Sequence, residues 1–354
     1  MIVLCTLYDS NYLNRGLALY ESIERYTKDY IMYVLAMDDQ CYDILTDMHL
    51  SRMIAIRLSE FENEALREAK TNRSRGEYCW TCKASLIKYA IENSNQGYCA
   101  YLDSDLYFYG DPNTMISEME ECQASVMLVG HRYNFGLAKK KEWKAGRYCA
   151  GTIVVKNDAN GRAMLDGWEK QCLENCSLLN DGIHCGDQKY LDEWADNNSY
   201  VVETKNMGAG IAPWNVAQYR FVNENEEGPL NISHKGVIYP VLFYHYHALV
   251  YTSAHTVKTF AMTAWGTSKK LLDSFYIPYL HHIERIDNML GNKYGVRHKP
   301  LTVIKDENES MIDGRRLRRG LRKVFSFFTI QGFLFSLFED FPTKYYWKED
   351  EVTF

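Results

Sequence analysis

The fold class is indicated most clearly by the stretch Tyr98-Cys-Ala-Tyr-Leu-Asp-Ser-Asp-Leu-Tyr-Phe-Tyr-Gly-Asp-Pro112. It opens with a short apolar and aromatic run, which is typical of a strand buried on both faces. The run ends in two aspartates, Asp103 and Asp105, separated by one residue. In an extended segment this spacing places both carboxylates on one side, with Ser104 opposite. The sequence therefore predicts a buried strand that delivers two acids to one edge of a sheet.

Strand and helix patterns alternate before this stretch. Apolar runs predict strands, and apolar residues at helical spacing predict helices. The predicted strands are Met1–Leu7, Tyr30–Met37 and Ile54–Leu58, and the predicted helices are Arg15–Tyr26, Glu60–Lys70 and Ala84–Glu92. Such alternation predicts βα units and therefore an α/β fold with a mainly parallel sheet.

The pattern continues after the aspartates and then changes. Ala124–Gly130 and Gly151–Lys156 are predicted strands, and Ala163–Cys176 is a predicted helix. From about residue 255 the strand patterns fade, and we expect helices over Thr256–Thr263 and Ser268–Asn288, the second interrupted near Ile277-Pro278. The expected organisation is an α/β domain over 1–255, a helical extension over 256–300, and a linker with a C-terminal tail over 301–354.

Composition limits the class of protein. The chain has 354 residues, of which 46% are hydrophobic and 24% charged, so it is globular and long enough to bury a large core. A net charge of −6 argues against a nucleic-acid binder, which needs a broad basic face. Cys79-x-x-Cys82 and the pair Cys172 and Cys176 lack the closing spacing of a four-ligand zinc site. Reduced, buried thiols in the cytoplasm are the expectation, since no basic segment precedes the first strand.

Asp103 and Asp105 are candidate metal ligands. Two carboxylates so close repel each other unless a cation lies between them. Hard oxygen ligands suit Mg²⁺ or Mn²⁺, and open α/β sheets bind ligands at the carboxyl ends of their strands. The alternative is a solvated turn after a strand, because Asp-x-Asp is a common tripeptide.

Two histidines are candidates to complete such a site. His245 and His247 alternate in Val241-Leu-Phe-Tyr-His-Tyr-His-Ala-Leu249, so both imidazoles should point to one side of a strand. Imidazole nitrogen is a common metal ligand. The alternative for each is a core histidine that has its own hydrogen-bond partners.

Five short motifs follow one another along the chain. They are Thr6-Leu-Tyr-Asp-Ser-Asn-Tyr-Leu-Asn-Arg-Gly16, Glu77-Tyr-Cys-Trp-Thr-Cys-Lys83, Leu102-Asp-Ser-Asp105, Gly186-Asp-Gln188 and His245-Tyr246. In this order they resemble the motifs of GT-A nucleotide-sugar glycosyltransferases. The chain is most similar to family 8, the glycogenin and galactosyltransferase-like enzymes, and within it to bacterial proteins from polysaccharide gene clusters. The resemblance covers roughly residues 1–290 and implies a Rossmann-like, mixed, mainly parallel sheet flanked by helices.

The resemblance also implies roles for particular residues. Asp103, Asp105 and His245 would bind Mn²⁺ or Mg²⁺, with His247 as the second choice for the histidine, and the ion would assist departure of the nucleoside diphosphate. The residues implied to bind the nucleotide sugar are Thr6, Tyr8, Asp9, Tyr12, Lys83, Asp103, Ser104 and Asp105. The residues implied to act in catalysis are Asp187, Gln188 and Lys83.

Within this set, chemistry suits each residue to its role. Tyr12 would stack on uracil and Asp9 would accept from the base or ribose. Lys83 would meet the donor phosphates, while Asp187 and Gln188 would hydrogen-bond sugar hydroxyls. Structural alternatives stay open: Tyr12 as a loop aromatic, Lys83 as a solvated helix residue, and Asp187 as a helix N-cap.

One position departs from the family pattern. The chain reads Cys149-Ala-Gly151 where the family has Asn-Ala-Gly or Asn-Ser-Gly, and a thiol cannot donate an amide hydrogen bond to a sugar. Asn206-Met-Gly-Ala-Gly210 and Pro213-Trp-Asn215 are expected to line the acceptor side, with an ordinary turn cluster as the alternative.

The implied reaction is transfer of a hexose from a UDP-sugar to a saccharide hydroxyl, with retention of configuration. An inverting reaction, with Asp187 as base, stays open. The rival functions are a non-catalytic nucleotide-sugar or saccharide-binding protein and a sugar-nucleotide nucleotidyltransferase. The latter needs a glycine-rich phosphate loop after the first strand, and Asp9-Ser-Asn-Tyr12 is not such a loop.

The C-terminal tail suggests a membrane surface. Six basic residues and no acid lie between Arg315 and Lys323, and 13 uncharged residues rich in phenylalanine and leucine span Ser326–Phe338. This run is shorter than the roughly 20 residues that span a bilayer, but a basic and aromatic segment suits an anionic surface. Residues 315–338 would then place the protein on the inner leaflet, near a lipid-linked saccharide acceptor. The alternative is a helix packed on this domain or on a second subunit of a homo-oligomer.

Overall fold

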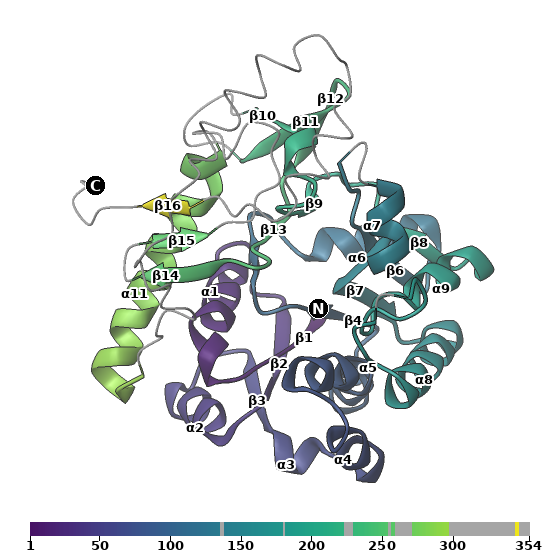
Figure 1. Ribbon diagram of the computed structural model, residues 1–354, viewed down its shortest axis with the longest axis horizontal. Coiled ribbons are helices and arrows are strands. Elements are labelled where there is room, and N and C mark those ends of the chain that lie inside the picture. Colours follow the sequence, from purple (N-terminus) through teal and green to yellow (C-terminus); the bar gives the residue numbers. More distant parts are fainter. Residues whose placement is uncertain are drawn as a thin grey trace.

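A seven-stranded mixed sheet lies at the centre of the computed structural model, with strand order β3-β2-β1-β4-β7-β6-β8 (Figure 1). The structure describes residues 1–134, 138–179, 181–222, 229–253, 256–258, 271–296 and 344–346. The strands of this sheet are β1 (Ile2–Tyr8), β2 (Tyr30–Ala36), β3 (Met53–Arg57), β4 (Tyr98–Leu102), β6 (Val126–Gly130), β7 (Tyr148–Lys156) and β8 (Val201–Glu203). Neighbouring strands are parallel except for β7, which is antiparallel to β4 and β6. The predicted α/β fold with a mainly parallel sheet is confirmed.

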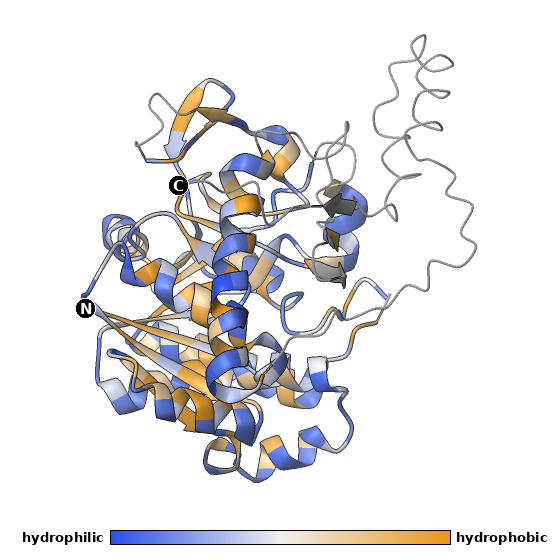
Figure 2. Ribbon diagram, turned by 90° about the vertical axis from the view of Figure 1, so that its left-hand side faces the viewer, coloured by the Kyte–Doolittle hydropathy of each residue, from blue (hydrophilic) through white to orange (hydrophobic). Residues whose placement is uncertain are grey.

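Helices cover both faces of the sheet, which explains why its strands are apolar along their length (Figure 2). In β1, Ile2 and Leu4 face one core, while Val3 and Cys5 face the other. Helices α1, α2, α6 and α11 pack in the first core, and α4, α5, α8 and α9 pack in the second. The helices are α1 (Leu13–Glu24), α2 (Asp39–Met48), α3 (Leu58–Phe61), α4 (Glu64–Lys70), α5 (Arg75–Ser94), α6 (Asn113–Cys122), α7 (Ala138–Ala145), α8 (Ala159–Glu174), α9 (Leu191–Asn197) and α11 (Ile277–Tyr294).

Short strands beyond the main sheet bring distant segments to the end of β4. The sheet β5-β13-β9 joins β5 (Leu106–Phe108), which follows the two aspartates, to β13 (Phe243–His245). Register pairs His245 with Leu106, one residue after Asp105. The remaining strands are β9 (Ala209–Ile211), β10 (Arg220–Val222), β11 (Asn231–His234), β12 (Val237–Pro240), β14 (Val250–Ser253), β15 (Thr256–Lys258) and β16 (Lys344–Tyr346). The short helical turns are η1 (Ser10–Tyr12), η2 (Val216–Gln218) and η3 (Leu272–Tyr276).

The C-terminal helix α11 closes one side of the molecule by packing on α1 (Figure 1). Its buried face includes Tyr279, Ile283 and Leu290, and Asn14 of α1 donates a hydrogen bond to Asp287 (2.9 Å). Pro278 stands in the first turn of α11, where a missing N–H has no cost, so the predicted interruption is the junction of η3 and α11. The helical C-terminal extension is confirmed.

Two predicted elements differ from the structure. Thr256–Lys258 is a strand, not the start of a helix, because it pairs with β14 and β16. The predicted helix Glu60–Lys70 is two helices, since Asn63 is in extended conformation and its side chain caps α4. The 300–314 linker and the 315–338 segment lie outside the described residues, and within the described part of the chain no helix has the length and hydropathy of a membrane span.

Candidate active site

Asp103 and Asp105 lie in a turn between β4 and β5, not in an extended segment as expected. The N–H of Leu106 donates to the Asp103 carbonyl (3.2 Å), which closes the turn. The two carboxylates still converge on one imidazole. His245 Nε2 lies 3.0 Å from Asp105 Oδ1 and 3.8 Å from Asp103 Oδ2. Convergence thus comes from β13 being paired with β5, and not from strand periodicity alone.

His245 and His247 flank a firmly held residue, Tyr246. Its N–H donates to the Asp105 carbonyl (2.9 Å), its ring stacks on Tyr279 at 3.7 Å, and its hydroxyl donates to Phe275 (2.7 Å). These contacts fix the backbone between the two histidines against the acidic turn. The predicted placement of both imidazoles on one side is confirmed, because one nitrogen from each lies within 4.8 Å of an Asp105 oxygen.

Asp105, His245 and His247 are the group that could hold a metal ion among the described residues. Carboxylate oxygen with imidazole nitrogen is a ligand set for divalent transition metals, Mn²⁺ among them. Burial acts to raise the pKa of Asp105 and to lower that of His245, but their mutual attraction outweighs it, so the pKa of Asp105 is lowered and that of His245 is raised. A divalent ion at this place would displace the proton shared by the pair and take over its charge balance. The oxygen and nitrogen atoms present fit such an ion.

Gly151 leaves the space in which these side chains meet. A Cβ at this position would come within 2.8 Å of both Asp103 Oδ2 and His245 Cε1. Gly151 lies in β7 next to the turn, and its carbonyl accepts from the Asp103 N–H (2.8 Å). Any side chain there would push the carboxylate away from the imidazole.

Lys83 is buried behind the turn and has three acceptors. Its Nζ lies 3.1 Å from Asp103 Oδ1, 3.1 Å from Asp187 Oδ2 and 3.2 Å from the Ala150 carbonyl. Burial acts to lower the pKa of Lys83, but the charges of Asp103 and Asp187 outweigh it and raise that pKa. The alternative of a solvated helix residue is excluded, since only 3% of Lys83 is exposed.

Asp187 is presented by a tight loop and not by a helix end. Gly186 has φ of +57°, which favours glycine, and its missing side chain leaves room for the Trp80 ring. The N-cap alternative is excluded, because α9 begins at Leu191. Burial raises the pKa of Asp187 to about 6 against the opposing charge of Lys83. Gln188 follows on the same loop, and its amide donates to Cys185 Sγ (3.5 Å).

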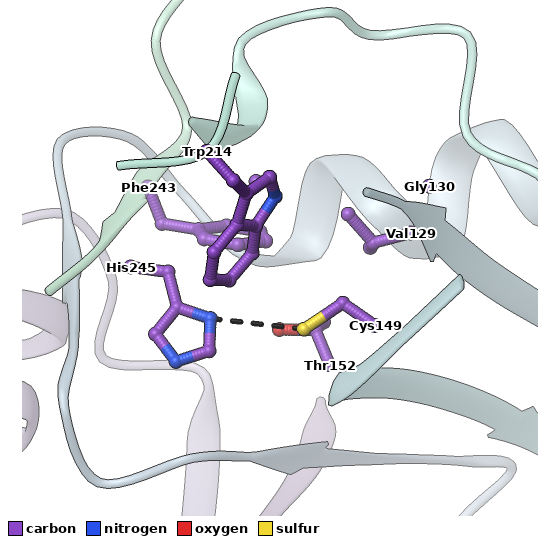
Figure 3. Close-up of a pocket in the computed structure, with 8 residues that line it drawn as sticks. Val129, Gly130, Cys149, Thr152, Trp214, Phe243 and His245 are labelled. Atoms are coloured by element: carbon purple, nitrogen blue, oxygen red, sulfur yellow. Dashed lines mark hydrogen bonds between the residues drawn. The ribbon is translucent and has the colours of Figure 1, made fainter. Parts of the chain in front are cut away.

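Cys149 faces the Nδ1 nitrogen of the His245 ring (Figure 3). His245 Nδ1 is 3.7 Å from Cys149 Sγ, and the Gly151 N–H donates to the same sulfur (3.4 Å). Burial acts to raise the pKa of the thiol, but hydrogen bonding to His131 and His245 lowers it to about 6. The thiol therefore takes the role of an acceptor at the imidazole.

A small pocket surrounds this sulfur. Its volume is about 10 Å³, which suits about one water molecule. Its lining residues are Val129, Gly130, Cys149, Thr152, Gly210, Trp214, Phe243 and His245. All ten cysteines of the chain have free thiols, in agreement with the predicted reduced state.

The predicted nucleotide residues divide into buried and exposed members. Thr6 and Tyr8 are buried, and the Tyr8 ring packs against Gly16. Asp9 caps η1 through the Asn11 N–H (2.9 Å). Tyr12 is 37% exposed, so its ring can be reached from solvent. Tyr12 is thus the accessible one of these four residues, whereas Asp9 is held by the η1 cap and by Arg75, and Thr6 and Tyr8 are buried.

Known proteins were compared with the whole chain. No protein-family model matches it. The uncharacterized proteins YfnF and YfnD of Bacillus subtilis (strain 168) are 28% and 25% identical to it, over 79% of this chain and over 91% and 88% of their own lengths, respectively. An active-site variant of the galactosyltransferase LgtC superposes with a TM-score of 0.51 at 13% identity, covering 80% of this chain and 96% of LgtC. LgtC is a GT-A glycosyltransferase. The chain has the GT-A fold.

In this GT-A fold, several residues near the site were not singled out from the sequence. Arg75 forms ion pairs with Asp9 and with Asp38 (3.3 Å), which ties the start of α5 to the first βα loop. The signal was available, because Ser74 and Glu77 form a capping box that marks a helix start. His131 had no such signal, since only tertiary structure brings it to Cys149.

Trp214, which was assigned to the acceptor side together with its neighbours, borders the imidazoles in the GT-A fold. Its ring centroid lies 5.3 Å from those of both His245 and His247, edge to face in each case. The indole therefore forms one wall of the space in front of the two histidines.

Proposed function

We propose that the chain is a metal-dependent glycosyltransferase that moves a hexose from a UDP-sugar to a saccharide acceptor with retention of configuration. The observation that carries this proposal is the convergence of Asp103 and Asp105 on His245 at the carboxyl end of β4. Open α/β sheets bind their ligands at that edge. The GT-A fold of the chain and the named activity of LgtC, a galactosyltransferase, support the same class of reaction.

The proposed ion is Mn²⁺ or Mg²⁺, held by Asp105 and His245 with Asp103 beside them. When bound, it would supply Lewis-acid stabilisation of the departing diphosphate. Lys83 neutralises Asp103 and Asp187 from behind and has its donors committed to them, so its part is to hold both carboxylates in place. Tyr12 offers an accessible ring for the base.

Retention is supported by the environment of Asp187. An inverting reaction needs a carboxylate base that can reach the incoming hydroxyl. Asp187 is 4% exposed and is paired with Lys83, which suits it to orienting the donor sugar and not to deprotonating an acceptor. We assign Gln188, half-buried on the same loop, to the sugar hydroxyls.

The test is release of UDP from a panel of UDP-sugars, with Mn²⁺ or with EDTA. One donor should be hydrolysed slowly in a metal-dependent reaction, and Asp103→Asn and Asp105→Asn should each reduce the rate at least about a hundredfold, because an electrostatic contribution to the leaving group is lost. Asp166→Asn, an exposed carboxylate that pairs with Lys88, is the matched control and should leave the rate unchanged.

Other results separate the rival functions. Binding of UDP and Mn²⁺ by calorimetry, with no turnover on any donor or acceptor, would favour a non-catalytic binding protein. Formation of a UDP-sugar from a sugar phosphate and UTP would favour the nucleotidyltransferase. Absence of UDP binding in the presence of Mn²⁺ would refute the proposed site.

A further inference from the structure

We infer that His247 is a direct ligand of the divalent ion, so that the centre carries two imidazoles and selects Mn²⁺ or Co²⁺ strongly over Mg²⁺. This inference rests on the proposed metal dependence and goes beyond it, because that proposal assigns only His245 as a histidine ligand. It concerns which ion the protein takes up.

The first support is distance. One ligand atom from each of Asp105, His245 and His247 lies within 4.8 Å of the others. Ligand bonds to divalent metals are about 2.1 Å, so two ligands of one ion lie at most about 4.2 Å apart. The separation of up to 4.8 Å therefore exceeds that of two ligands of one ion by only a few tenths of an ångström, and His247, the exposed member, has its side chain on the solvent side.

The second support is the backbone that carries His247. It lies in a tight turn in which the Leu249 N–H donates to the Tyr246 carbonyl (3.2 Å). Ala248 in this turn has φ of +57°, a left-handed conformation that non-glycine residues seldom adopt. Such strain persists where the surrounding structure requires it, and it concentrates at functional sites. Here the turn holds the second imidazole beside the first.

The third support is the protonation pattern. A metal-binding imidazole must present a bare nitrogen, and its other nitrogen then donates to an acceptor. His245 has that acceptor, Cys149 Sγ, on the Nδ1 side, which directs Nε2 to Asp105. The His247 ring lies beside this imidazole, with the two ring centroids 5.7 Å apart.

Ligand chemistry then sets the selectivity. Mg²⁺ prefers oxygen ligands and gives up its waters reluctantly, whereas imidazole suits transition metals. Each added imidazole therefore strengthens the binding of Co²⁺ and Mn²⁺ more than that of Mg²⁺. The expected order of affinity is therefore Co²⁺ over Mn²⁺ over Mg²⁺. The difference in affinity between Co²⁺ and Mg²⁺ should be larger in the wild type than in a variant that lacks the His247 imidazole.

The test is calorimetric titration of the full chain with each metal alone, without nucleotide, which removes any role of His247 in phosphate binding. His247→Ala should weaken Co²⁺ binding at least tenfold and Mg²⁺ binding less than threefold, and should shift the visible absorption of the Co²⁺ complex. His281→Ala, a half-buried helix histidine paired with Glu284 on α11, is the control and should change neither. Circular dichroism checks that each variant is folded.

The outcomes separate the two proposals. If Asp105→Asn abolishes Co²⁺ binding while His247→Ala leaves affinity and spectrum unchanged, the centre exists and the assignment of His247 is wrong. If Asp105→Asn, Asp103→Asn and His247→Ala all bind metal as the wild type does, the proposed metal site fails together with this inference. Equal weakening of Mg²⁺ and Co²⁺ by His247→Ala would overturn the selectivity.

Discussion

The two sides of the candidate site handle charge in opposite ways. On one side, Lys83 lies buried between Asp103 and Asp187, so that two carboxylates share one cation. On the other, Asp105 meets His245, with the exposed His247 beside them. The first arrangement is held by a buried lysine, whereas the second includes the exposed imidazole of His247 among its metal-binding groups.

This difference separates two aspartates that stand two residues apart. Asp103 accepts from Lys83 and from the Tyr101 hydroxyl (3.0 Å), so most of its capacity is used by the protein. Asp105 pairs with His245, and the charges of His247 and Arg15 also lower its pKa. Two aspartates of one motif therefore have different environments. Asp103 is bound by groups of the protein, whereas Asp105 belongs to the candidate metal-binding group.

The largest expected effect comes from removing the cation on the buried side. Lys83→Met should lower the free energy of unfolding by about 3–5 kcal/mol, because it leaves two carboxylates buried without their counter-charge. Lys88→Met, on the same helix but with partly exposed partners Asp166 and Glu169, should cost at most about 1 kcal/mol. Urea unfolding of both variants measures the difference. Equal losses would show that the buried pairs have no special weight.

The pH dependence of stability tests the electrostatics of the Lys83 side through Asp187, with a smaller expected effect. Its pKa is raised from 3.8 to about 6, so the folded protein holds a proton that the unfolded chain has lost. The stability linked to this proton is fully present below pH 3.8 and is lost as the pH rises through about 6. Relative to Asp187→Asn, which cannot titrate, the wild type should lose up to about 3 kcal/mol across this window.

Unfolding by urea at intervals between pH 4 and 7 gives this difference directly. Other groups titrate in both proteins and cancel. A difference between wild type and Asp187→Asn that stays constant over the window would contradict the raised pKa of Asp187.

The smallest expected effect on stability comes from Gly151, which lies between Asp103 of one side and His245 of the other. Gly151→Ala places a methyl group 2.8 Å from Asp103 Oδ2 and His245 Cε1, so the carboxylate and imidazole must separate. We expect a loss of about 1–2 kcal/mol in stability and a severalfold loss in Mn²⁺ affinity. Gly167→Ala in α8 meets open space and should stabilise slightly, as alanine does in helices. Unchanged Mn²⁺ affinity in Gly151→Ala would show that the two sides are independent.

The strands could be predicted from the sequence because burial on both faces leaves a strong signal. Tyr98–Leu102 was predicted with the bounds that it has. Helix α2 was missed because Asp38 ends a strand and also caps the next helix through the Cys41 N–H (2.8 Å). Helix α5 was predicted from Ala84 although it begins at Arg75, since its first turn is polar and carries a glycine, Gly76. Local composition predicts the start of a helix poorly where the capping residue also follows a strand.

In the site, residue identity was easier to predict than environment. The acidic turn, the two histidines and Lys83 were all singled out, yet the burial of Lys83 depends on Asp187, more than a hundred residues away. The neighbourhood of Cys149 likewise depends on pairing between distant strands. Such contacts are set by topology, which no local pattern records.

The packing of α11 on α1 also governs the order of events during synthesis. Glu21 of α1 pairs with His282 (2.8 Å) and Arg285 of α11, so the outer face of α1 is covered by a helix about 250 residues later in the chain. A ribosome that adds about 5–20 residues per second needs roughly 15–50 s to make that interval. The first βα unit therefore waits, partly uncovered, until almost the whole described chain has emerged. Its folding is completed from the opposite end of the chain.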